Sequence, residues 1–189
     1  GSEMCIRDSF VARKDYRKTY DVYKDDTLLN RKPKKSRKIF VCLDEQRGQY
    51  LVDGLIAMDF PLSSGVKAYP TKTGDYTVIS KKEDHASNLY GKMYDAEGKC
   101  INYNAESTDP VPEGGRFDGS PMPYWQRLTN AGLGLHVGKV RRHPISHGCV
   151  RLPRNVAEIL YKQTSVGTPV TIQRTPLPVP EAQKAPAVQ

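Results

Sequence analysis

Short apolar runs separated by turn-forming residues organise the first half of the core sequence. Residues 39–43 form an apolar run suited to a buried strand, and residues 49–52 and 55–60 each give a further strand pattern. Asp53-Gly54 lies between the last two runs, and this dipeptide strongly favours a two-residue hairpin turn. The pattern therefore predicts that these two strands form a β-hairpin.

The second half of the sequence adds more strands and one helix. Strand patterns recur at residues 76–79, 132–137, 150–152 and 168–172. Residues 155–162 place Val156, Ile159 and Leu160 at helical spacing, and Pro153 precedes them as it often does at a helix start. Many short strands with turn signals and one principal helix predict a mainly β fold, either a sandwich or barrel-like.

Three regions are predicted along the chain. Residues 1–30 are interpreted as an N-terminal extension, residues 31–174 as the folded domain, and residues 175–189 as a disordered, proline-rich tail. The extension begins with Gly1-Ser2, which has the form of a tag or cloning remnant, so the nearby Cys5 is given no function.

Two stretches inside the domain have weak strand or helix patterns. Residues 81–119 are polar and rich in turn signals, and a connection of this length is expected to be functional or to carry short structure of its own. Residues 122–128 are compatible with a strand or with a short turn of helix.

Charge and hydropathy restrict the partners. The formal net charge is +8, which favours anionic partners. The densest basic run, residues 31–38, contains a proline but no aromatic residue, and is interpreted as a solvated lead-in loop. No zinc-finger, helix-turn-helix or RNA-binding signature accompanies it, so no nucleic-acid partner is predicted. No run approaches the roughly 18 apolar residues of a membrane span.

The tetrapeptide Ser146-His147-Gly148-Cys149 carries the candidate chemistry. His136 lies thirteen residues before Cys149, at the end of a predicted strand. A thiolate is the reactive form of cysteine, and an imidazole partner makes it available at neutral pH. We therefore predict that Cys149 is a nucleophile with His136 as its base, and that His147 orients the loop or contacts substrate.

Backbone groups around the cysteine complete the predicted site. Gly148 allows a tight turn, so that the amides of His147, Gly148 and Cys149 point inward as an oxyanion hole. Acceptors for the second ring proton of the upstream histidine follow it directly, at the carbonyls of Val137 and Gly138.

Arg151 and Cys42 keep two interpretations each. Arg151 either pairs with a substrate carboxylate or makes a surface ion pair. Cys42 lies in an apolar strand pattern and is expected in the core, yet it would also be able to pair with Cys100 in an oxidising compartment.

These motifs resemble the signature of the L,D-transpeptidase (YkuD-type) catalytic domain. The resemblance lies first in the His136-Val137-Gly138 segment and the run from Ser146 to Leu152. The segment from Ser63 to Val78, with Thr71-Lys72-Thr73-Gly74 inside it, also resembles a family motif. The similarity covers roughly residues 38–173.

The resemblance implies a fold, an activity and a location. The fold is a β-sandwich with a long flap over the cleft. The family attacks the peptide stem of peptidoglycan: the cysteine forms a thioester at the diamino acid of stem position three, D-alanine leaves, and a neighbouring amine gives a 3→3 cross-link. No metal or other cofactor is required, carbapenem-type β-lactams are expected to inhibit, and the location is extracytoplasmic.

By the same resemblance, some side chains are expected to contact substrate: Ser146, Arg151, Tyr124 and Trp125. For Tyr124 and Trp125, core packing is an equal alternative. Other functions remain open: an L,D-carboxypeptidase that uses water, a non-catalytic wall-binding domain, a general thiol protease, or a zinc module. The zinc module would use His136, His143, His147 and Cys149, whose spacing matches no common zinc pattern.

Overall fold

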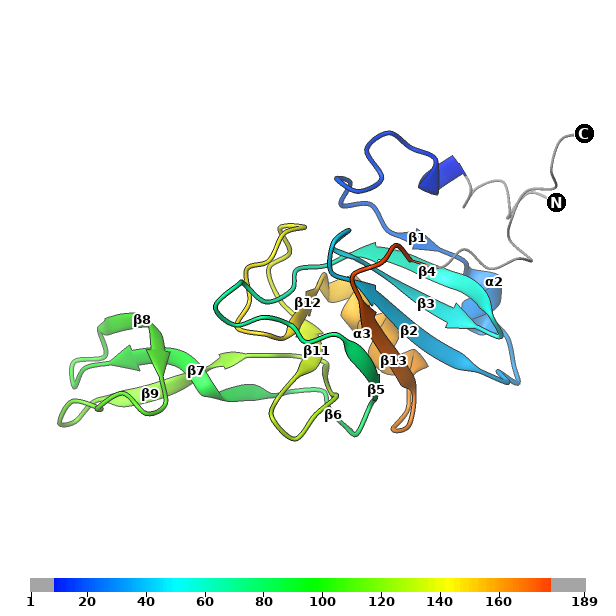
Figure 1. Cartoon of the computed structure of the whole chain (residues 1–189). Helices are drawn as coiled ribbons and strands as arrows, with labels where there is room; N and C mark the ends of the chain where they lie inside the picture. The colour runs from blue at the N-terminus through cyan, green and yellow to red at the C-terminus, as the bar shows by residue number, and fades with distance from the viewer. Residues whose placement is uncertain (1–8, 178–189) are drawn as a thin grey trace, which may run out of the picture.

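The computed structural model describes residues 9–177, and a six-stranded sheet forms one layer of it (Figure 1). The strand order is β1–β4–β3–β2–β13–β5. The strands are β1 (Tyr23–Lys24), β4 (Leu55–Pro61), β3 (Arg47–Val52), β2 (Arg37–Cys42), β13 (Pro169–Gln173) and β5 (Gly74–Thr77). Asp53 and Gly54 both have positive φ, at 51° and 80°, and close the predicted hairpin between β3 and β4.

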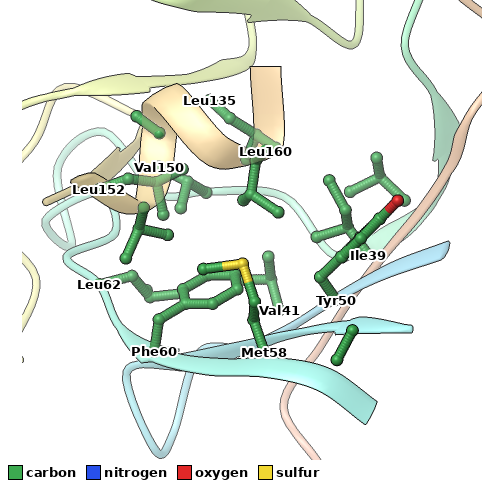
Figure 2. Packing of buried hydrophobic residues seen from close by; sticks show 14 of the residues in the cluster. Ile39, Val41, Tyr50, Met58, Phe60, Leu62, Leu135, Val150, Leu152 and Leu160 are labelled. Carbon is green, nitrogen blue, oxygen red and sulfur yellow. The ribbon is translucent and has the colours of Figure 1, made fainter. Parts of the chain in front are cut away.

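A four-stranded sheet and the principal helix form the opposing layer. Its strands, in the order β12–β11–β10–β6, are β12 (Val150–Leu152), β11 (Gly134–Val137), β10 (Trp125–Arg127) and β6 (Ser80–Lys82). Helix α3 (Arg154–Gln163) follows β12 directly. Figure 2 shows side chains of the two layers meeting in one apolar core, with Leu135, Val150 and Leu160 above Phe60 and Met58. The mainly β sandwich with one principal helix is confirmed.

A third, three-stranded sheet projects from this body (Figure 1). Its order is β8–β7–β9, with β7 (Ala86–Tyr94), β8 (Cys100–Glu106) and β9 (Arg116–Pro121). It occupies most of the polar stretch at residues 81–119, which therefore carries structure of its own. We call this sheet the flap.

The segment expected as an N-terminal extension packs on the outer face of the six-stranded sheet. β1 pairs with β4, and helix α2 (Asp26–Asn30) follows with Asp25 as its N-cap. Arg47 and Asp59 form an ion pair at 2.8 Å on this face, both fully buried. Because the segment covers it, β3 is buried on both faces.

The proline-rich tail and Cys5 fall largely outside this description. Leu177, the last described residue, is buried, whereas Cys5 and residues 178–189 lie beyond the described range. No helix within residues 9–177 is long and apolar enough to cross a membrane.

Candidate active site

The parallel pair of β11 and β12 brings the predicted reacting groups to one face. His136 pairs with Arg151, and Leu135 with Val150. Since side chains alternate along a strand, Cys149 and Arg151 face the same way, and His136 shares that face. Leu135 and Val150 point to the opposite face and enter the core. The alternation thus places the candidate site residues on one face of the sheet and the core residues on the other.

His136 is held in one orientation, and its lowered pKa favours the neutral imidazole. Its Nδ1 lies 2.7 Å from Val137 O, so this nitrogen carries the proton and donates, while Nε2 keeps its lone pair. The ring is 6% exposed, and burial lowers the pKa of His136 to about 4. Two carbonyls were expected to orient the His136 ring, and the one that it contacts is that of Val137. Gly138 instead donates its own N–H to Leu152 O, which joins the end of β11 to β12.

The thiol of Cys149 is also uncharged at rest. Burial raises the pKa of Cys149, against smaller lowering effects from the Gly134 backbone and the charge of Arg151. Sγ donates to Gly132 O at 3.3 Å. Within residues 9–177 no hydrogen bond joins the sulfur to the imidazole, and both pKa shifts favour the neutral forms of the two groups.

The loop before Cys149 is held by hydrogen bonds of the Ser146 side chain. Ser146 Oγ donates to Cys149 O at 2.5 Å and accepts from Gly148 N at 3.2 Å. Gly148 has φ of 113°, a conformation that favours glycine. Its N–H is therefore engaged, contrary to the predicted oxyanion role, whereas those of His147 and Cys149 have no acceptor in the described part of the chain.

A second segment, which contains Gly65 and Thr71, packs against this loop and hydrogen-bonds to it. Thr71 Oγ1 donates to Gly148 O at 2.6 Å and accepts from Gly65 N at 2.8 Å. A Cβ on Gly65 would lie 2.1 Å from Tyr69 O, so only glycine fits this approach. The motif from Ser63 to Thr71 thus acts as a backing for the nucleophile.

His147 joins the loop to the flap. Its ring stacks on Tyr90 of β7 at 4.5 Å and contacts Tyr69 at 4.8 Å. Tyr69 and Tyr90 meet edge to face at 6.0 Å. These three rings connect the flap to the loop before Cys149, which is consistent with the loop-orienting role expected for His147.

The aromatic residues at 124 and 125 have different surroundings. Trp125 lines the cavity and lies between His85, at 5.2 Å, and His136, at 6.0 Å. Tyr124 packs on Tyr161 of α3 at 5.5 Å, and belongs to the core packing rather than to the cavity wall. Sequence reasoning gave no role to His85 or Tyr90, since only the folded arrangement of β7 and the residue before it brings them here.

Cys149, His136, His147 and Trp125 border one cavity of about 1250 Å³ between the flap and the four-stranded sheet. Arg151 lines it, half-buried, and has no ion-pair partner within residues 9–177, which disfavours the surface ion pair. No group of three His, Cys, Asp or Glu side chains in this range is arranged to hold a metal, and His143 is exposed. Cys42 and Cys100 are both free thiols.

A family model of the L,D-transpeptidase catalytic domain (YkuD) matches residues 36–172, most of the chain. The chain belongs to the YkuD L,D-transpeptidase family. A curated relative of this L,D-transpeptidase domain, the probable L,D-transpeptidase 3 of Mycobacterium tuberculosis, is 32% identical over 120 residues. That match covers 60% of the chain but only 38% of the relative.

Solved L,D-transpeptidase structures share the fold. One from Mycobacterium smegmatis superposes with a TM-score of 0.56 at 22% identity, over 73% of this chain and 58% of that one. The LD transpeptidase LdtMt1 in complex with imipenem gives 0.55 at 20% identity, over 72% and 58%. The chain therefore spans less than two thirds of the length of each of these relatives.

Proposed function

We propose that this chain is a cysteine-dependent L,D-transpeptidase that acts on peptidoglycan stem peptides and forms 3→3 cross-links. The observation that carries the proposal is that Cys149, directly before β12, and His136 on β11 share a face that opens on one large cavity. Such a substrate lies outside the cytoplasm, so the proposed location is extracytoplasmic.

In the first half-reaction the Cys149 thiol proton passes to His136 Nε2 as sulfur attacks the stem carbonyl. Because Nδ1 donates a hydrogen bond to Val137 O, Nε2 keeps its lone pair and accepts the thiol proton. The amides of His147 and Cys149 are the available donors to the developing oxyanion. His136 then gives the proton to the leaving amine of D-alanine, which leaves a thioester.

In the second half-reaction an amine of a neighbouring stem attacks the thioester. Its proton passes to His136 and from there to the departing sulfur, which restores the thiol. Water in place of the amine would give an L,D-carboxypeptidase product from the same intermediate. Analysis of the products by mass spectrometry, as cross-linked dimer or free tripeptide stem, distinguishes the two.

The test of the proposed function is acylation by imipenem, since LdtMt1 is known in complex with that compound. We expect intact-protein mass spectrometry to show one imipenem adduct on the reduced chain, and peptide mapping to place it on Cys149. Cys149→Ala should give none, whereas Cys100→Ala should still react. A chain that folds, stays reduced and gives no adduct contradicts the proposal.

A further inference from the structure

The cavity wall is strongly cationic. Lysine and arginine line it at Lys72, Lys81, Lys82, Arg127, Lys139 and Arg151, against one carboxylate, Glu106. The ammonium of Lys81 is already used, since it donates to Tyr161 O and Thr164 O. The other five have no ion-pair partner within residues 9–177. A partly enclosed wall with this excess of positive charge favours an anionic ligand.

The strand register spaces these charges around the reacting groups. Arg151, His136, Trp125 and Lys82 occupy one row across the four-stranded sheet, so cations stand at both ends of it. Three inter-strand spacings separate the ends, roughly 14 Å. An extended peptide of four residues spans about the same length, roughly 14 Å.

Arg127 adds an ordered cation to the cavity wall. It pairs with Gly134, two residues before His136 on β11. Its Nε and Nη2 donate to Thr129 O and Asn130 O, both at 3.0 Å, and Nη1 has no acceptor in the described residues. A guanidinium already ordered by backbone carbonyls loses little entropy when it binds a carboxylate.

We infer that this site selects stem peptides by their free carboxylates, and that stems amidated at those carboxylates are poor substrates. The inference rests on the proposed function and adds a specificity to it. Amidation keeps the shape of each group but removes its charge, so it isolates the effect of the cationic wall.

The test compares two tetrapeptide stems that differ only in amidation. In one, the isoglutamate carboxylate and the D-centre carboxylate of the diamino acid are free, and in the other both are amides. We expect the full chain to release D-alanine from the free-carboxylate stem with a kcat/KM about tenfold higher, and the ratio to shrink at high salt.

Variants of single lysines test whether the cavity wall causes the preference for the anionic stem. Lys82→Gln and Lys139→Gln should each lower kcat/KM on the anionic stem by about two- to fivefold and leave the amidated stem within about twofold. Lys99→Gln, exposed in the turn between β7 and β8 and outside the cavity, removes the same charge and should leave the ratio unchanged.

The outcomes separate the two claims. If imipenem acylates Cys149 and both stems react with equal kcat/KM, the inferred selectivity is overturned while the proposed function stands. If imipenem leaves no adduct and neither stem reacts, both are overturned. A preference that Lys99→Gln reduces as much as Lys82→Gln also contradicts the inference, because net charge rather than the cavity wall would then be responsible.

Discussion

The two reacting residues both rest without charge. Burial raises the pKa of the Cys149 thiol and lowers that of His136 to about 4. A preformed thiolate–imidazolium pair would need the opposite shifts, with a low thiol pKa and a raised imidazole pKa. In the proposed mechanism the proton of Cys149 therefore passes to the imidazole during attack on the substrate.

This resting state predicts the pH dependence of Cys149 alkylation by iodoacetamide. Above its pKa a thiol is thiolate, and here that pKa lies above the ordinary value, so the rate should keep rising through and beyond the usual thiol range. No plateau is expected near neutral pH. Peptide mass spectrometry measures Cys149 separately from the other cysteines.

The His136→Gln variant is the control for this profile. A neutral imidazole contributes no charge to stabilise the thiolate, so the variant should keep nearly the same alkylation curve while it loses turnover. A reactive plateau at neutral pH that disappears in His136→Gln would show a resting ion pair and contradict the assignment.

Individual site residues differ in how far the sequence predicts them. The short spacing around Cys149 marks the nucleophile and its base candidate, and the carbonyl of Val137 follows from its position next to His136. The Gly148 amide could not be assigned, because its use by Ser146 depends on the loop's folded shape. Tyr124 and Trp125 are neighbours in sequence, and only β10 decides which of them faces the cavity.

At the scale of elements, prediction succeeds where one face is buried. The strands β2, β3 and β4 carry apolar runs because they pack on the core. The flap strands β7, β8 and β9 are largely exposed, with Leu89, Ile101 and Tyr103 among their exposed side chains. Such strands lack the alternation that signals a half-buried sheet, so the sequence shows only a long polar connection.

The flap is joined to the nucleophile loop by aromatic rings, and this predicts the effect of Tyr90→Ala. Loss of the ring stacked on His147 should loosen the flap and raise KM for the stem about two- to tenfold, the range of one aromatic pair. The effect on kcat should be smaller, because Cys149 and His136 are held by β12 and β11. Faster hydrogen exchange at β7 amides would report the loosening.

Tyr90→Phe is the matched control, since it keeps the ring and removes only the hydroxyl. If ring stacking alone matters, kcat and KM of Tyr90→Phe should stay within about twofold of those of the parent. If Tyr90→Phe is as impaired as Tyr90→Ala, the hydroxyl rather than the stacked ring is what matters, and the joint between flap and loop is assigned wrongly.

At the scale of the whole molecule, the N-terminal segment completes the sheet. The matched family region begins at residue 36, yet strand β1 and the backbone of Tyr16, Thr19 and Asp21 lie before it. Arg47 donates to all three of these carbonyls. The sequence did not show this, because the segment is weakly patterned: its carbonyls accept from the buried Arg47, and Phe10 and Tyr23 pack with the small apolar cluster of the same face.

Arg47→Met tests whether this segment belongs to the folding unit. Asp59 accepts from Arg47, Tyr16 and Gln49 in a fully buried position, so loss of the guanidinium leaves a buried carboxylate without its counter-charge. We expect the free energy of unfolding to fall by about 3–5 kcal/mol in urea titrations. Arg13→Met, which removes an exposed arginine of the same segment, should leave the midpoint nearly unchanged. Equal, small effects of both would mean that residues 9–30 add nothing to the stability of the catalytic domain.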